Sequence, residues 1–133
     1  MTSSDDDYDF TLYHDKEDLS GTTYLEIAPD GWQHHWEAGM SFVSDDALIK
    51  ADGFDLIRRY YPDFDPRADN CISALCASTI ADAMSDHATR LHHPGKAKLL
   101  QDIAHVLSRL SRDGNPVWIL GLLFVTQTLT MRQ

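Results

Sequence analysis

The stretch TTYLEIAPDGWQHHWE, residues 22–37, decides the fold class of this chain. Its first seven residues are rich in the β-branched and aromatic types that favour strands, and Pro29-Asp30-Gly31 is a strong turn signal. After the turn, Trp32, His34 and Trp36 would share one face of a second strand. The stretch therefore predicts a β-hairpin. A further alternating segment, Phe10–His14, adds a strand and completes a small N-terminal antiparallel sheet.

Beyond Gly39 the apolar residues recur every three or four positions, which is typical of helices. Four helices are predicted, and three of them have a start signal such as Ser44-Asp45-Asp46 or Asn115-Pro116. They cover residues 44–60 with an interruption at Gly53, residues 70–91 with Asp69 or Asn70 as the cap, a stretch around Leu99–Leu110, and a C-terminal segment from Pro116.

The C-terminal segment contains the longest apolar run, Val117–Val125. It is apolar nearly all round, so we expect a helix buried centrally and wrapped by the two amphipathic helices before it. Nine apolar residues are about half of the ~20 needed to cross a bilayer, so no membrane partner is expected.

These patterns predict an α+β fold: a small N-terminal antiparallel β-sheet, as a hairpin or meander, followed by a helical half of about four helices with a buried apolar C-terminal helix. The chain has 133 residues and a mass of 15.0 kDa, which suits one domain. Residues 1–9 carry four aspartates and are expected to form a mobile acidic tail, and residues 10–133 a single α+β domain.

Charge is distributed unevenly along the chain, whose formal net charge is −10. Residues 1–70 hold 17 acidic and 5 basic residues, whereas residues 71–133 hold 4 acidic and 6 basic residues. The excess of negative charge excludes a surface that attracts nucleic acid along its whole extent. Because tyrosine and tryptophan are interleaved with these aspartates, the N-terminal half has the composition of a face that binds a basic protein.

The leading hypothesis is therefore a small acidic inhibitor that blocks a basic partner by steric and electrostatic occlusion, as immunity proteins, antitoxins and anti-CRISPR proteins do. The partner would be a toxin, a nuclease or a subunit of a nucleoprotein complex, with no direct contact to nucleic acid. Asp5, Asp6 and Asp7 would steer the encounter. The residues predicted to contact the partner are Asp15, Glu17, Asp18, Asp30, Glu37, Asp45, Asp46, Asp52, Asp63, Asp65, Tyr60 and Tyr61.

No motif of an enzyme or a cofactor site is found, so we expect neither catalytic activity nor a cofactor nor a metal ion. Two alternatives stay open. One is a secretion or assembly chaperone for a basic client, which could form a homodimer. The other is a metal-dependent enzyme that uses His34, His35 and Glu37, since the last two would share a strand face. The N-terminal sequence MTSSDDDYDF is acidic where a signal peptide would be basic and then apolar, which predicts a cytoplasmic location.

Overall fold

The computed structural model describes residues 8–20, 23–35, 37 and 39–124. Asp5, Asp6, Asp7 and Trp36 lie outside the described residues. The elements in chain order are η2 (Lys16–Asp18, a 3-10 helix), β1 (Thr23–Pro29), β2 (Ser41–Ser44), α1 (Asp45–Lys50), α2 (Gly53–Tyr60), β3 (Asn70–Ile72), α3 (Ala74–Ala88), α4 (Pro94–Ser111) and β4 (Val117–Phe124).

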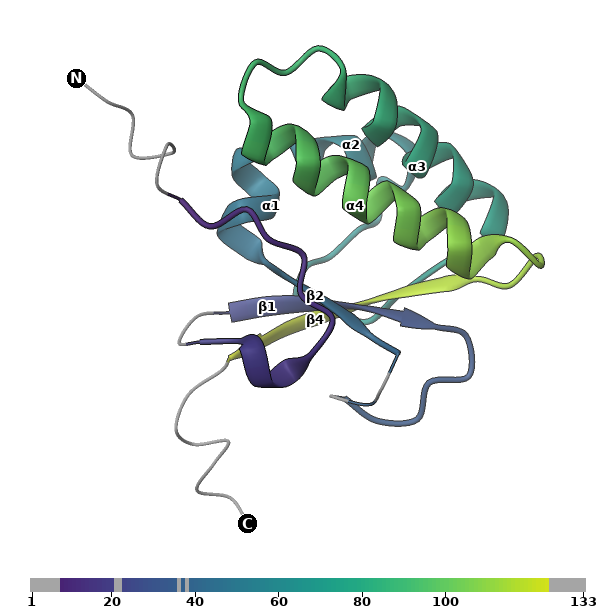
Figure 1. The fold of residues 1–133 in the computed structure, drawn as a ribbon. Helices are drawn as coiled ribbons and strands as arrows, with labels where there is room; N and C mark the ends of the chain where they lie inside the picture. Colours follow the sequence, from purple (N-terminus) through teal and green to yellow (C-terminus); the bar gives the residue numbers. More distant parts are fainter. Residues whose placement is uncertain (1–7, 21–22, 36, 38, 125–133) are drawn as a thin grey trace.

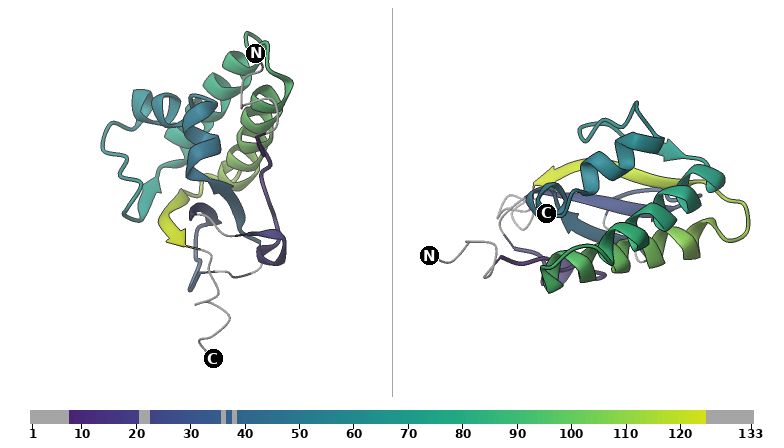
Figure 2. Two further views of the ribbon diagram at one scale, coloured as in Figure 1. Left: turned by 90° about the vertical axis from the view of Figure 1, so that its left-hand side faces the viewer. Right: turned by 90° about the horizontal axis from the view of Figure 1, so that it is seen from above.

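The four strands form one antiparallel sheet in the order β2-β1-β4-β3, and the four α-helices lie on one side of it (Figures 1 and 2). The predicted α+β class is confirmed. Strands β1 and β4 occupy the centre of the sheet and pair over most of their length, from Thr23 opposite Phe124 to Pro29 opposite Val117. The register shifts once, between Tyr24 and Glu26, which marks a β-bulge.

The main hydrophobic core lies between the sheet and the helices. Leu25 and Ile27 of β1, together with Val117 and Ile119 of β4, pack in one cluster with the apolar stripes of α3 and α4. Burial of this continuous apolar area is the chief stabilising contribution to the fold.

The opposite face of the sheet is covered by irregular chain rather than by helices. η2 and the β1–β2 connection lie on this side in Figure 1. Tyr24, Ala28 and Phe42 form a second buried cluster here, and Leu19 and Trp32 pack over it. Since both faces of the sheet are covered, its central strands are apolar at nearly every position.

The predicted C-terminal helix is wrong, because residues 117–124 form the central strand β4. A strand buried on both faces shows no alternation of polar and apolar residues, so its pattern resembles that of a buried helix. At Gly121 the backbone of β4 passes close to the backbone of Arg67, which leaves no space for a side chain. A Cβ atom at this position would lie 2.7 Å from the carbonyl carbon of Arg67 and 2.8 Å from its oxygen.

The N-terminal sheet is also built differently from the prediction. Phe10–His14 contributes only an isolated bridge, in which Tyr13 pairs with Phe42. The second strand of the hairpin is β2, Ser41–Ser44, whereas the described residues of 32–37 form no strand. The connection after Pro29 therefore folds back over the sheet and places Trp32 against Trp118, with ring centroids 6.1 Å apart.

The boundaries of two helices also differ from the prediction. The helix expected over residues 44–60 is divided into α1 and α2 at Asp52, which adopts a left-handed conformation with φ 68°. The helix expected from residue 70 begins only at Ala74, after its cap Ser73, because Asn70–Ile72 form β3. Among the described residues, no helix has both the length and the apolar character needed to cross a bilayer.

Candidate functional site

The predicted partner-binding residues fall into four places in the structure rather than on one element. Asp45 and Asp46 form the first turn of α1, and the Thr23 hydroxyl at the start of β1 donates a hydrogen bond of 2.7 Å to Asp45. Asp30 follows the other end of the same strand, which spans about 20 Å. The two ends of β1 therefore present separate groups of acidic side chains.

A cavity of about 240 Å³ lies near the Thr23 end of β1 and collects tyrosine side chains. We call it the tyrosine pocket. Its lining residues come from the N-terminal segment, the chain after η2, β1 and the end of β2: Tyr8, Asp9, Thr11, Tyr13, Ser20, Tyr24 and Ser44. The rings of Tyr13 and Tyr24 meet edge to face, with centroids 6.3 Å apart. Aromatic rings and a carboxylate in one cavity suit the side chain of a lysine or an arginine.

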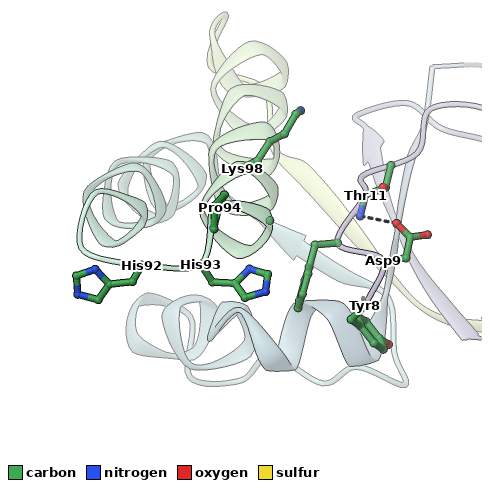
Figure 3. A pocket seen from close by; sticks show the side chains of 9 residues that line it. Tyr8, Asp9, Thr11, His92, His93, Pro94 and Lys98 are labelled. Atoms are coloured by element: carbon green, nitrogen blue, oxygen red, sulfur yellow. Dashed lines mark hydrogen bonds between the residues drawn. The ribbon is translucent and has the colours of Figure 1, made fainter. Parts of the chain in front are cut away.

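Asp9 is held in place within this pocket. Its carboxylate accepts a hydrogen bond from the Tyr13 hydroxyl and another, of 3.1 Å, from the backbone N–H of Thr11. The second of these bonds is drawn in Figure 3. The hydrogen bond to Asp9 raises the pKa of Tyr13 to about 12, and partial burial of the phenol adds to the shift. At neutral pH the pocket therefore contains a neutral phenol and a negatively charged carboxylate.

Asp45 and Asp46 extend the negative charge beyond the pocket. Burial raises the pKa of Tyr8, and the nearby charges of Asp46 and Asp45 raise it further, against the opposing effects of Ser44 and Lys50. The Lys50 ammonium lies 5.3 Å from the centre of the Tyr8 ring. The tyrosine ring at this rim thus already contacts one cation of the protein itself.

Three more predicted residues belong to the chain beside the tyrosine pocket. Asp15, Glu17 and Asp18 are exposed and lie in or next to η2, between Tyr13 and Ser20, which both line the pocket. The Asp15 carboxylate accepts a hydrogen bond of 3.0 Å from the backbone N–H of Glu17 and so caps the short helix. The three acids therefore belong to a short segment whose two flanking residues, Tyr13 and Ser20, line the pocket.

Asp30 and Glu37 lie at the other end of β1, in the β1–β2 connection. Asp30 accepts a hydrogen bond of 3.4 Å from the Trp118 indole. Glu37 accepts hydrogen bonds of 2.9 and 3.1 Å from the backbone N–H groups of Gln33 and His34, and these bonds lower its pKa. Both carboxylates therefore have a structural role in this connection.

The remaining predicted residues lie in or beside α2. Asp52 pairs with His87 of α3 at 2.9 Å. The loop after α2 contains Asp63 and Asp65, both exposed, and the Asp65 backbone N–H donates a hydrogen bond of 3.0 Å to Asn70. Tyr60, 39% exposed, and half-buried Tyr61 precede this loop.

The residues considered for a metal site do not converge. The His35 ring is hydrogen-bonded through Nδ1 to Glu26 at 2.5 Å, whereas Glu37 binds backbone groups, one of which belongs to His34. Within residues 8–20, 23–35, 37 and 39–124, no group of three or more histidine, cysteine or acidic side chains is arranged to hold a metal ion.

The buried residue that sequence reasoning missed is Glu26, whose side chain is fully buried on the second face of the sheet.

Sequence reasoning also left the central residues of the tyrosine pocket out of the predicted contact set. Tyr8 and Asp9 were assigned to the tail, although Tyr8 packs against the core and Asp9 binds Tyr13. A useful signal was the order Tyr8, Phe10, Leu12, in which Phe10 and Leu12 are buried and Tyr8 packs beside them.

No protein-family model, curated protein or solved structure matches this chain.

Proposed function

We propose that this chain is a small acidic inhibitor that binds a basic protein, such as a nuclease or a subunit of a nucleic-acid-binding complex, and occludes its working surface. It would act in the manner of immunity proteins, antitoxins and anti-CRISPR proteins, as a cytoplasmic binding protein without catalysis of its own. The observation that carries the proposal is the tyrosine pocket beside Asp45 and Asp46, in the half of the chain that holds the excess negative charge.

The chemistry of the pocket supports a basic side chain as its ligand. A lysine or arginine of the partner would place its charge near Asp9 and its stem against the ring of Tyr13, since the Tyr8 ring already contacts Lys50. The carboxylates around it would accelerate the encounter, because attraction between opposite charges steers association. Asp15, Glu17 and Asp18 beside the pocket would add to this steering.

The test starts with the untagged protein as bait in a lysate of its native host. Bound proteins are eluted with a salt gradient and identified by mass spectrometry. We expect one basic partner that is released only at high salt. Its activity, for example cleavage of nucleic acid, should fall in proportion to the added protein. A captured partner that is acidic, or whose activity is unchanged at saturation, would rule out the proposed function.

A pair of matched variants then locates the contact. Asp45→Asn/Asp46→Asn removes two charges beside the tyrosine pocket, and Asp82→Asn/Asp113→Asn removes two exposed charges on α3 and after α4. We expect the first variant to lower the affinity about tenfold or more and to weaken its salt dependence, because each close charge pair contributes measurably to binding. The second variant should bind like the unmodified protein. Equal losses in both variants would show that net charge, and not this site, determines the affinity.

A further inference from the structure

A second cavity, on the α4 side of the N-terminal segment, has the opposite character to the tyrosine pocket. Its volume is about 510 Å³, and we call it the α4 cavity. Its walls are the N-terminal segment and the outer face of α4: Phe10, Thr11, Leu12, His14, Lys98, Asp102, His105, Val106 and Arg109. Two cations and two imidazoles face a single carboxylate in this lining.

The α4 wall is a regular stripe. Lys98, Asp102, His105 and Arg109 follow one another at intervals of four, three and four residues, which places them on one face of the helix. Lys98 and Asp102 form an ion pair of 2.6 Å and neutralise each other. Arg109 is exposed and forms no ion pair with the part of the chain that the structure describes, so its charge remains available to a ligand.

His14 approaches the cavity from the opposite wall. The Ser41 hydroxyl lies 2.9 Å from its Nδ1 atom, which orients the ring and leaves Nε2 as the second nitrogen. Ser41 is itself buried in β2, so this contact fixes His14 to the sheet. His105 and Arg109 reach the same cavity from α4. In the tautomer in which Nδ1 accepts from the Ser41 hydroxyl, Nε2 carries the proton and donates to a ligand. Ring and guanidinium nitrogens therefore line the cavity from two separate elements.

The adjoining cavity is lined by two imidazoles, one lysine and one carboxylate, but by no arginine. It is about 690 Å³ in volume and shares Phe10, Thr11 and Lys98 with the α4 cavity. Figure 3 shows His93 turned toward the N-terminal segment and His92 turned away from it. His93 Nδ1 accepts a hydrogen bond of 3.2 Å from Lys96 N–H, and its ring packs edge to face on Phe10. His93 thus has a structural role, and the arginine that faces this side of the N-terminal segment, Arg109, lines the α4 cavity instead.

We propose that the α4 cavity binds a phosphate group through Arg109, His105 and His14. A guanidinium and two imidazoles on two walls can donate to three oxygens of a tetrahedral anion, whereas a planar carboxylate offers two. Five of the nine lining residues come from α4, in the half of the chain with the small positive balance, and the other four, His14 among them, come from the N-terminal segment. This binding is independent of the proposed inhibition, because no residue of the phosphate set lines the tyrosine pocket.

The test is a titration of the untagged full chain with sodium phosphate, followed by NMR of the histidine ring signals at constant pH and ionic strength. We expect saturable shifts for His14 and His105 and none for His34, which lies in the β1–β2 connection. Sodium chloride and sodium acetate serve as the competing anions. Shifts of equal size with chloride or acetate would overturn the proposal, since they would report only screening or a general anion effect.

Two arginine variants separate the site from general charge. Arg109→Ala removes the guanidinium that lines the cavity, and Arg112→Ala removes an exposed charge at the end of α4 that does not line it. We expect Arg109→Ala to weaken phosphate binding about tenfold, because a hydrogen bond to a charged group is lost. Arg112→Ala should bind like the unmodified chain. Both residues are exposed, so circular dichroism should show the same fold in each variant.

Two phosphate esters identify the source of the group. A phosphoserine peptide and a nucleoside monophosphate are each titrated in the same way, together with the unphosphorylated peptide and the nucleoside. Binding of either ester at His14 and His105, with no binding of its dephosphorylated form, supports the site and names its carrier. If neither ester nor inorganic phosphate shifts these two histidines, the α4 cavity is not a phosphate site.

Discussion

The hydrogen bond from the Tyr13 hydroxyl to Asp9 sets the charge of the tyrosine pocket. The carboxylate favours the neutral phenol, so the folded-state pKa is raised to about 12 from the ordinary value of 10. The stability that this pair contributes is therefore fully present below about pH 10 and is lost as the pH rises through about 12. Near neutral pH the pocket keeps its negative charge on Asp9 alone.

Asp9→Asn is expected to lower the pKa of Tyr13 from about 12 toward the ordinary value, because the amide carries no charge to oppose the phenolate. The ultraviolet absorbance of ionised tyrosine measures this pKa, and the difference between variant and unmodified chain assigns it to one residue. Asp18→Asn, an exposed acid on η2, is the matched control and should leave the titration unchanged. An unchanged curve for Asp9→Asn would mean that Asp9 does not hold Tyr13 in solution.

Glu26 is the second residue whose environment matters, because its carboxyl is fully buried among apolar side chains on the second face of the sheet. The loss of one hydrogen bond by a buried acceptor is costly. We expect His35→Ala to lower the free energy of unfolding by about 1–3 kcal/mol through the loss of the hydrogen bond to Glu26. Urea unfolding measures this loss.

Two further variants distinguish the hydrogen bond from the loss of a ring. His34→Ala, at an exposed neighbouring position, should change the stability by no more than about 0.5 kcal/mol. His35→Asn keeps a donor near the position of Nδ1 and should be intermediate. If His35→Asn is as destabilised as His35→Ala, the ring contact with Trp32 carries the effect instead.

At the scale of elements, one substitution distinguishes a helix from a strand in the segment Val117–Phe124. The two structures predict opposite signs for its effect on the free energy of unfolding. In a helix, Gly121→Ala would add stability of about 1 kcal/mol, because alanine is the better helix former. In β4 the added methyl group would meet the backbone of Arg67 at 2.7 Å. We therefore expect Gly121→Ala to destabilise the chain by about 1–3 kcal/mol in urea unfolding, as overpacking does. A gain in stability would contradict the strand and its contact with the loop after α2.

The elements that the sequence predicted well are those with a pattern of their own. Strand β1 and helices α3 and α4 show β-formers or a regular apolar stripe, and they lie where they were expected within a few residues. Strand β4 could not be distinguished from a buried helix, because its burial on both faces removes the alternation. Strand β2 has only four residues, too few for a clear pattern, and it pairs with β1 and, through Phe42, with Tyr13.

At the scale of the whole molecule, the charge asymmetry was readable from the sequence, but the site was not. Counting acids predicted which half of the chain is negative, whereas only the fold shows that Asp45 lies beside Tyr8 and that Asp30 lies at the opposite end of β1. Net charge can be summed along a sequence. A pocket cannot be located in this way, because its walls come from residues far apart in the chain. Tyr8 and Ser44 line one cavity across 36 positions for this reason.

The same charge predicts how salt affects stability. The chain has a net charge of −10, so repulsion among its carboxylates opposes the folded state. Among the described residues, the ion pairs Arg90–Asp86 and Lys98–Asp102 lie on exposed helix faces and contribute little attraction. Added sodium chloride screens the repulsion more than it weakens these pairs. The thermal midpoint of unfolding should therefore rise with sodium chloride at moderate ionic strength, as calorimetry would measure. A midpoint that falls with salt would mean that attractive ion pairs outweigh the repulsion among the carboxylates. The acidic surface would then be neutralised by the chain's own basic residues, which contradicts the proposed steering of a basic partner.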